Sequence, residues 1–213
     1  MTDNKVNTII GLLEKEYPDV KIALSHSTPF DMLIATILSA QCTDVRVNMV
    51  TESLFKKYKT PQDYIRTSQE ELEKDIYSTG FYRNKAKNIK KLSDILVRDF
   101  DSKVPDTMEE LLTLPGVARK TANVVLSAAF GKNEGIAVDT HVKRLSGRLG
   151  LTENTDPEKI EKDLLKIVPK DRWGDFTLIL IRHGREICKA RKPLCRDCVL
   201  NKLCPSAFLK KGK

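Results

Sequence analysis

Four of the five cysteines lie close together near the C-terminal end of the 213-residue chain. They are Cys188, Cys195, Cys198 and Cys204, with the spacing C-x6-C-x2-C-x5-C. Four thiolates this close in sequence can surround one metal centre, and the residues between them are too few and too polar to form a core of their own. The pattern therefore predicts a metal site that holds this segment together.

Three kinds of cysteine chemistry fit such a set of residues. Disulfides are rare in intracellular chains, so we disfavour them. All-cysteine zinc sites usually contain two C-x2-C pairs, and only Cys195 and Cys198 form such a pair here. A 4Fe–4S cluster needs four thiolates at the corners of a cube and tolerates uneven spacing. The pattern favours this cluster as the cofactor and leaves zinc as the alternative. Cys42 lies apart, and we interpret it as a small buried hydrophobic residue within a helix.

A second candidate site is the segment L-P-G-V-A-R-K-T-A, residues 114–122, which joins a short helix to a long apolar one. Its Pro-Gly pair favours a tight turn that presents backbone N–H groups at the beginning of the next helix. A DNA phosphate fits such a site without contacts to bases, although an ordinary helical hairpin has the same local pattern. The residues expected to contact DNA here are Leu114, Gly116, Ala118 and Arg119.

Lys120 and Asp139 are the residues that suggest covalent chemistry. Lys120 lies in the first turn of a helix rich in alanine and valine. The positive end of the helix dipole and partial burial would both disfavour its protonated form, and a neutral amine can form a Schiff base. Binding of a phosphate is the simpler alternative for this lysine. Asp139, in V-D-T-H-V, is either a plain helix N-cap or a carboxylate aimed at the same site, and His141 is interpreted as structural.

The elements that must position these residues are helices. Apolar residues recur at helical spacing through most of the chain, and alternating β-branched residues are rare. The pairs Thr28-Pro29 and Asp156-Pro157 are typical helix starts, and Gly80, Gly131 and Gly150 are expected in left-handed C-caps. The sequence predicts an all-α chain with eleven helices, at about 3–17, 29–42, 45–58, 61–66, 69–78, 82–100, 107–112, 117–130, 140–149, 157–168 and 172–186.

The net charge of +8 is concentrated near the C-terminal end of the sequence. Residues 183–213 contain nine Lys or Arg and two acidic residues, which suggests an acidic partner, although an ordinary solvated face gives the same pattern. No apolar run approaches the roughly 20 residues of a membrane span. The polar N-terminal residues make a signal peptide unexpected, so we predict a cytoplasmic chain without a targeting signal and without a membrane partner.

The hairpin with Lys120, the V-D-T-H segment with Asp139 and the cysteine pattern occur in the order that is typical of one family. Together they resemble the endonuclease III family of helix-hairpin-helix DNA glycosylases. The segments L-S-A-Q-C-T-D (38–44), T-G-F-Y-R-N-K-A (79–86) and K-A-R-K-P (189–193) also resemble family motifs, so the resemblance covers nearly the whole chain. One departure is Ala118, where many members have glycine; its methyl group would alter the backbone approach to phosphate.

The resemblance implies a two-domain helix-hairpin-helix glycosylase fold. A six-helix domain would span 22–132, and a discontinuous helical domain would combine 1–21 with 133–213 and hold the iron–sulfur cluster loop. The partner would be double-stranded DNA that contains damaged pyrimidines or abasic sites, lying across a cleft between the domains. The protein would act as a monomer associated with the nucleoid.

The resemblance also implies the reaction. The chain would be a bifunctional DNA glycosylase and AP lyase of base excision repair that removes oxidised pyrimidines. Lys120 would displace the base of an extruded nucleotide and form a Schiff base, Asp139 would assist by proton transfer, and β-elimination would cleave 3′ to the abasic site. Gln41 would fill the space left by the base and Phe81 would wedge between bases of the other strand. Phosphates would be bound by Lys189, Arg191 and Lys192.

Three alternatives remain at this point. A mismatch or adenine glycosylase of the same superfamily would share the fold, but such enzymes usually lack a lysine at the position of Lys120. A non-catalytic DNA-binding iron–sulfur protein would need neither Lys120 nor Asp139. An electron-transfer protein would explain the cysteines but not the hairpin. The combination of motifs therefore favours the bifunctional enzyme.

Overall fold

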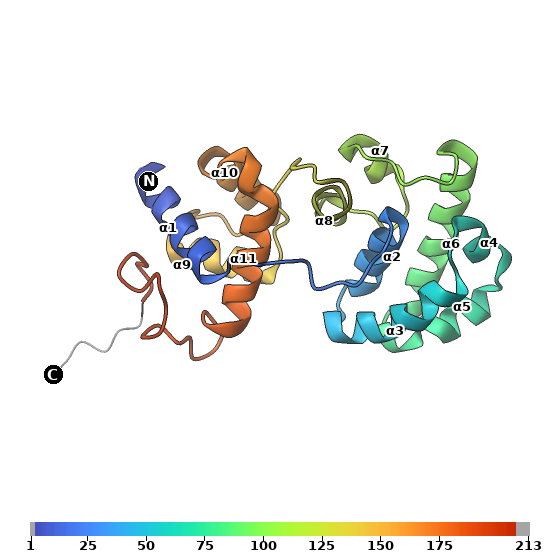
Figure 1. Cartoon of the computed structure of the whole chain (residues 1–213), viewed down its shortest axis with the longest axis horizontal. Helices are drawn as coiled ribbons and strands as arrows, with labels where there is room; N and C mark the ends of the chain where they lie inside the picture. Colours follow the sequence, from blue (N-terminus) through green and yellow to red (C-terminus); the bar gives the residue numbers. More distant parts are fainter. Residues whose placement is uncertain (1–2, 208–213) are drawn as a thin grey trace. The chain divides into compact units, whose positions relative to one another are not determined.

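The computed structural model describes residues 3–207, which form α-helices and two short 3₁₀ helices and contain no β-strand (Figure 1). The all-α prediction is confirmed, and each of the eleven expected helices is present within these residues. The elements are α1 (Asp3–Glu16), α2 (Pro29–Ser39), α3 (Asp44–Lys57), α4 (Pro61–Arg66), α5 (Gln69–Ile76), η1 (Tyr77–Thr79), α6 (Tyr82–Asp99), α7 (Met108–Thr113), α8 (Arg119–Phe130), α9 (Thr140–Leu149), α10 (Pro157–Ile167), η2 (Lys170–Arg172) and α11 (Trp173–Glu186).

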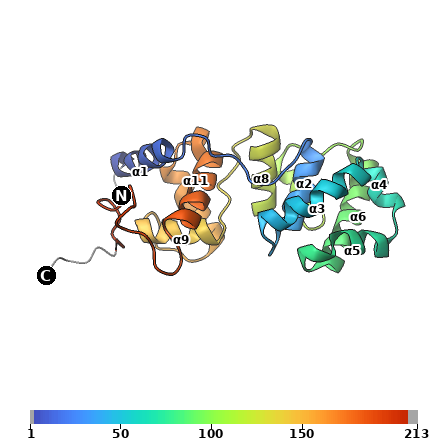
Figure 2. The same ribbon diagram turned by 60° about the horizontal axis from the view of Figure 1, so that its bottom comes forward.

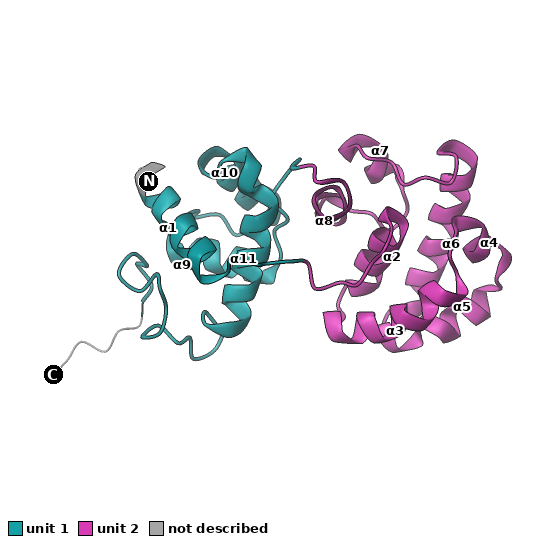
Figure 3. Ribbon diagram, viewed as in Figure 1, with its two compact units in different colours: residues 1–21, 133–213 teal, residues 22–132 magenta. Residues whose placement is uncertain are grey.

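The chain divides into two compact units, coloured separately in Figure 3. One unit is continuous and comprises residues 22–132, with α2 to α8. The other combines residues 1–21 with 133–213, so that α1 packs with helices from the last third of the chain. Each unit has its own hydrophobic core.

Helix α2 is the centre of the continuous unit. Its sequence is apolar on every side, and a helix of this kind must be buried all round. Residues 30–38 are all buried, with α3, α6 and α8 as the neighbours of α2 (Figures 1 and 2). The helix begins with a capping box, because the Thr28 hydroxyl accepts the Asp31 N–H at 3.0 Å and the Asp31 carboxylate accepts the Thr28 N–H at 3.1 Å.

The predicted helix ends are mostly confirmed. Gly131 and Gly150 have left-handed backbone (φ 64° and 69°) and end α8 and α9 as expected. The prediction for Gly80 is wrong, because its φ of 70° is combined with a ψ of 156° and it follows η1. The Asp156 carboxylate caps α10 by accepting the Lys159 N–H at 3.1 Å, as the Asp-Pro pair predicted.

In the discontinuous unit, α1 supplies an apolar stripe with helical spacing. Val6, Ile9, Ile10 and Leu13 are almost fully buried, and they pack in one cluster with α9, α10 and α11 side chains. The cluster also includes Ile136 and Leu200, so its members come from both ends of the chain. Among the described residues, none of the helices is long and apolar enough to span a membrane.

Candidate functional site

The segment between α7 and α8 forms a tight turn whose shape depends on Gly116. Its φ is +82°, a left-handed conformation that glycine adopts without strain. A Cβ atom at this position would lie 3.0 Å from Nδ2 and 3.1 Å from Cβ of Asn88, so the Asn88 side chain of α6 would have to move by a few tenths of an ångström. Ala118 is the N-cap of α8 and has no side chain that caps the first turn. Residues 118–120 are exposed at the beginning of α8, the end of a helix at which backbone N–H groups can bind an anion.

Lys120 is the second residue of α8 and is exposed. The predicted partial burial is wrong, because α8 packs Ala122, Val125 and Leu126 into the core and leaves its first turn outside. The amine is consequently accessible to a ligand at the beginning of the helix. Arg119, the neighbouring residue, is exposed as well.

Gln41 and Phe81 share an unusual backbone conformation. Both are exposed, and their φ angles of 54° and 49° lie in the left-handed region that residues with a Cβ atom rarely adopt. Helix α2 ends at Ser39 and not at residue 42 as predicted, because its C-cap Ala40 already leaves the helical backbone with a ψ of 114°. Cys42 is therefore not within a helix; it lies in the following turn, partly buried against the core.

Asp139 is the N-cap of α9, as predicted. Its Oδ1 atom accepts the backbone N–H groups of His141 and Val142, both at 2.8 Å. His141 is partly buried, which lowers its pKa, and its Nδ1 atom accepts a hydrogen bond from Arg144 at 3.2 Å. Its surroundings fit the structural role that we expected for it.

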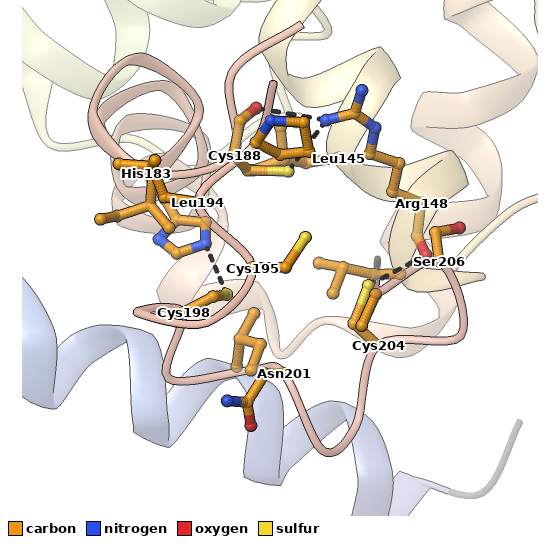
Figure 4. Close-up of a pocket in the computed structure, with 15 residues that line it drawn as sticks. Leu145, Arg148, His183, Cys188, Leu194, Cys195, Cys198, Asn201, Cys204 and Ser206 are labelled. Carbon is orange, nitrogen blue, oxygen red and sulfur yellow. Dashed lines mark hydrogen bonds between the residues drawn. The ribbon is translucent and has the colours of Figure 1, made fainter. Parts of the chain in front are cut away.

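The four C-terminal cysteines line one cavity (Figure 4). None of the four forms a disulfide, and apolar side chains such as Leu145, Leu149 and Leu200 complete the walls. In the described part of the chain, no three His, Cys, Asp or Glu residues are arranged to hold a metal ion. Four sulfurs around one cavity are a donor set of the kind that thiolate-bound metal centres use.

Two polar side chains face the sulfurs of this cavity. The Arg148 guanidinium lies 3.3 Å from Sγ of Cys188, and Nε2 of His183 lies 3.3 Å from Sγ of Cys198 (Figure 4). Burial lowers the pKa of His183 to about 4 and raises that of Tyr17 to about 12. The neutral imidazole can thus accept from the Tyr17 hydroxyl at Nδ1 (3.0 Å) and donate from Nε2 to the sulfur. Donors aimed at the sulfurs suit thiolates that carry negative charge.

Lys189, Arg191 and Lys192 are exposed on the loop that follows the first cysteine of the set. Lys192 has a φ of 52°. Sequence reasoning missed how this loop is held: Arg148, from α9, donates to the carbonyl oxygens of Lys189 at 2.8 Å and of Ala190 at 3.0 Å.

Arg144 supports the same loop from one helical turn earlier on α9. It donates to the carbonyl oxygens of Gly184 at 2.9 Å and of Cys188 at 3.1 Å. Two arginines four residues apart were the available signal in the sequence, but their partners lie about 40 residues away in the chain. The basic residues Lys210, Lys211 and Lys213 lie outside the described residues.

Comparison with known proteins defines the class. The profile of the HhH-GPD superfamily of base excision DNA repair proteins matches residues 34–170, which include the hairpin with Lys120 and the Asp139 cap. An endonuclease III from Synechocystis is 55% identical over 203 residues, covering 95% of this chain and 93% of that protein. An endonuclease III from Bacillus subtilis is 51% identical, covering 88% and 86%.

A solved structure supports the same assignment. A trapped endonuclease III–DNA covalent intermediate has a TM-score of 0.93 and 48% identity, with 97% of each chain covered. The chain belongs to the endonuclease III family. It is a DNA glycosylase and AP lyase of base excision repair, which excludes the non-catalytic and electron-transfer alternatives.

Proposed function

We propose that the enzyme removes oxidised pyrimidines from double-stranded DNA with Lys120 as the nucleophile. The observation that carries this proposal is the exposed amine of Lys120 in the first turn of α8. The adjacent N–H groups can bind a phosphate and so place the sugar of the damaged nucleotide near the amine. The solved covalent intermediate of a related endonuclease III supports a covalent mechanism. The lysine nitrogen bonds to the anomeric carbon as the bond to the base breaks, and opening of the sugar ring at that carbon gives a Schiff base. The Schiff base permits β-elimination, in which a C2′ proton is lost and the 3′ phosphate leaves.

Asp139 has a second role in this proposal. Both of its cap bonds end on Oδ1, so the N-cap geometry fixes the carboxylate through one oxygen. We assign to this carboxylate the proton transfer that assists the lysine and the stabilisation of the positive charge that develops on the sugar.

Gln41, Phe81 and Lys192 are proposed DNA contacts for a shared structural reason. Five residues other than glycine have positive φ within residues 3–207, and these three are among them. Left-handed backbone at a residue with a side chain is unfavourable, and such strain is concentrated at functional sites. Gln41 would occupy the space of the extruded base and Phe81, 62% exposed, would insert between bases of the other strand. Lys189, Arg191 and Lys192 would bind phosphates.

We assign a 4Fe–4S cluster to the cavity of Cys188, Cys195, Cys198 and Cys204. The cluster would hold the C-terminal loop in its fold and thereby present the basic residues that it carries. Anaerobically purified protein is expected to be yellow-brown, with broad absorbance near roughly 400 nm from thiolate-bound iron. Stoichiometric zinc without iron in that preparation would refute the assignment.

The covalent step is tested by borohydride trapping on DNA with a single abasic site. We expect a covalent complex whose modified peptide contains Lys120, as measured by mass spectrometry. Lys120→Gln should abolish trapping but retain binding to abasic DNA. Lys132→Gln is the matched control, because this lysine lies in the same unit but pairs with Asp106. A Lys120→Gln variant that is trapped at the wild-type rate would show that another amine is the nucleophile.

A further inference from the structure

Lys85 is a buried lysine to which the reaction assigns no role. Its side chain is 5% exposed, so it cannot serve as a surface contact for phosphate. Its Nζ atom donates to two backbone carbonyl oxygens, those of Leu38 and Thr79, each at 2.8 Å. A buried ammonium is costly unless it is hydrogen-bonded, so these bonds tie Lys85 firmly to both segments.

The two carbonyl groups belong to the segments that lead to Gln41 and Phe81. Leu38 lies in the last turn of α2, three residues before Gln41, where the negative end of the helix dipole favours a cation. Thr79 lies two residues before Phe81. The backbone N–H of Lys85 also donates to the carbonyl of Phe81 at 3.1 Å. Lys85 thus forms one hydrogen bond to the end of α2 and two to the segment of Thr79 and Phe81.

We infer that Lys85 is a positioning residue that fixes Gln41 and Phe81 relative to each other, so that both can enter the DNA helix at one extruded nucleotide. The left-handed backbone of these residues is intrinsically unfavourable and must be imposed by surrounding contacts. The Lys85 ammonium is placed to impose it, because it joins the end of α2 to the segment that precedes α6. This inference rests on the proposed DNA contacts of Gln41 and Phe81.

Lys90 provides a matched control on the same helix. It is also a lysine of α6, and its Nζ atom also donates to backbone carbonyl oxygens at the end of another helix, namely those of Tyr64, Ile65 and Thr67 near the end of α4. These acceptors do not adjoin Gln41 or Phe81 in the sequence. Replacement of Lys90 therefore removes a comparable set of bonds without releasing the two proposed insertion residues.

The test compares a lesion in fully paired duplex DNA with an abasic site in single-stranded DNA, which needs no base extrusion. Lys85→Met should lower base release from the paired lesion by about 10-fold or more, the scale of a misplaced recognition group. The rate of trapping on the single-stranded abasic site should stay within about 2-fold of wild type. The slope of log K against log salt for binding to undamaged duplex should stay unchanged. Lys90→Met should lower thermal stability but leave the ratio of the two activities unchanged.

A double-mutant cycle separates this inference from the proposed function. In a Gln41→Ala/Phe81→Ala background, Lys85→Met should add little further loss on the paired lesion. If the Gln41→Ala/Phe81→Ala variant retains the wild-type ratio, the insertion roles and the role of Lys85 are both wrong. If that variant is impaired but Lys85→Met retains the wild-type ratio, only the role of Lys85 is wrong.

A second measurement covers the case in which Lys85→Met does not fold. Lys85→Gln retains amide donors on a shorter side chain and should lose at least one carbonyl bond. Hydrogen exchange of this variant should accelerate in peptides that cover residues 39–43 and 79–83, relative to other peptides of the same unit. Uniform exchange across the unit would contradict a positioning role and support a purely structural one.

Discussion

Replacement of Asp139 separates two functions of one carboxylate. As the cap of α9, Oδ1 of Asp139 accepts two N–H groups at 2.8 Å, and an asparagine side chain can present an oxygen in the same place. Asp139→Asn should therefore change the free energy of unfolding by less than about 0.5 kcal/mol. Asp139→Ala removes the cap and should cost about 1 kcal/mol, or about 2–4 °C in Tm for a chain of this size.

The chemical consequence should be larger than the structural one. Asp139→Asn removes the charge that assists base release, and the loss of acid–base assistance typically costs about 10²-fold or more in rate. That factor corresponds to about 2.7 kcal/mol of transition-state stabilisation, several times the expected change in folding. Cleavage at a preformed abasic site should fall by less than about 10-fold, because the base has already left and Lys120 can still condense with the sugar aldehyde.

The assay is single-turnover base release from a damaged duplex, run beside cleavage of a preformed abasic site and thermal unfolding. Asp156 is the control, because it caps α10 through the same kind of bond and has no proposed chemical role. Asp156→Ala should lower Tm without changing either rate. Base release by Asp139→Asn at the wild-type rate would refute the catalytic assignment. If Asp139→Asn loses as much stability as Asp139→Ala, the argument that asparagine preserves the cap of α9 is wrong.

Three further outcomes are expected. The combined alanine variant of Lys189, Arg191 and Lys192 should bind all DNA sequences more weakly, with the slope of log K against log salt reduced by about 0.9 for each lost contact; an unchanged slope would show that the loop does not touch phosphate. Gly116→Ala should lower the free energy of unfolding by about 1–2 kcal/mol for the left-handed backbone; Asn88→Ala should restore only part of the steric cost, because its Cβ atom stays 3.1 Å from the new methyl group. On a panel of lesions, oxidised pyrimidines should be released faster than oxidised purines, and equal rates would contradict the proposed substrate class.

The helices could be predicted because their signals are local. Thr28, Asp156, Gly131 and Gly150 each begin or end a helix through bonds to residues a few positions away, so the sequence contains both partners within one short window. The cysteine set could also be predicted from the sequence, since four ligand-type residues lie within a single loop-rich segment.

The features that were missed depend on contacts that are distant in the chain. The end of α2 was placed three residues too late, because the ammonium that bonds to its last turn belongs to Lys85, 47 residues further on. The burial of Lys120 was predicted from the composition of its helix, but which side of α8 faces the core is decided by the helices packed around it. The spacing of Arg144 and Arg148 did not reveal their role, because the carbonyl acceptors of both side chains are about 40 residues away.

The discontinuous unit has a consequence for synthesis on the ribosome. Apart from Tyr17 and Val20, which directly follow it, the core partners of the buried stripe of α1 lie from Ile136 onward, more than 100 residues after α1 has been made. At a synthesis rate of roughly 5–20 residues per second, the apolar face of α1 stays uncovered for on the order of 10 s. Residues 22–132 can already fold as a continuous unit during this time. Helix α1 is therefore the helix most exposed to misassociation during synthesis, and a truncated product that ends before Ile136 would leave it without most of the core that buries it.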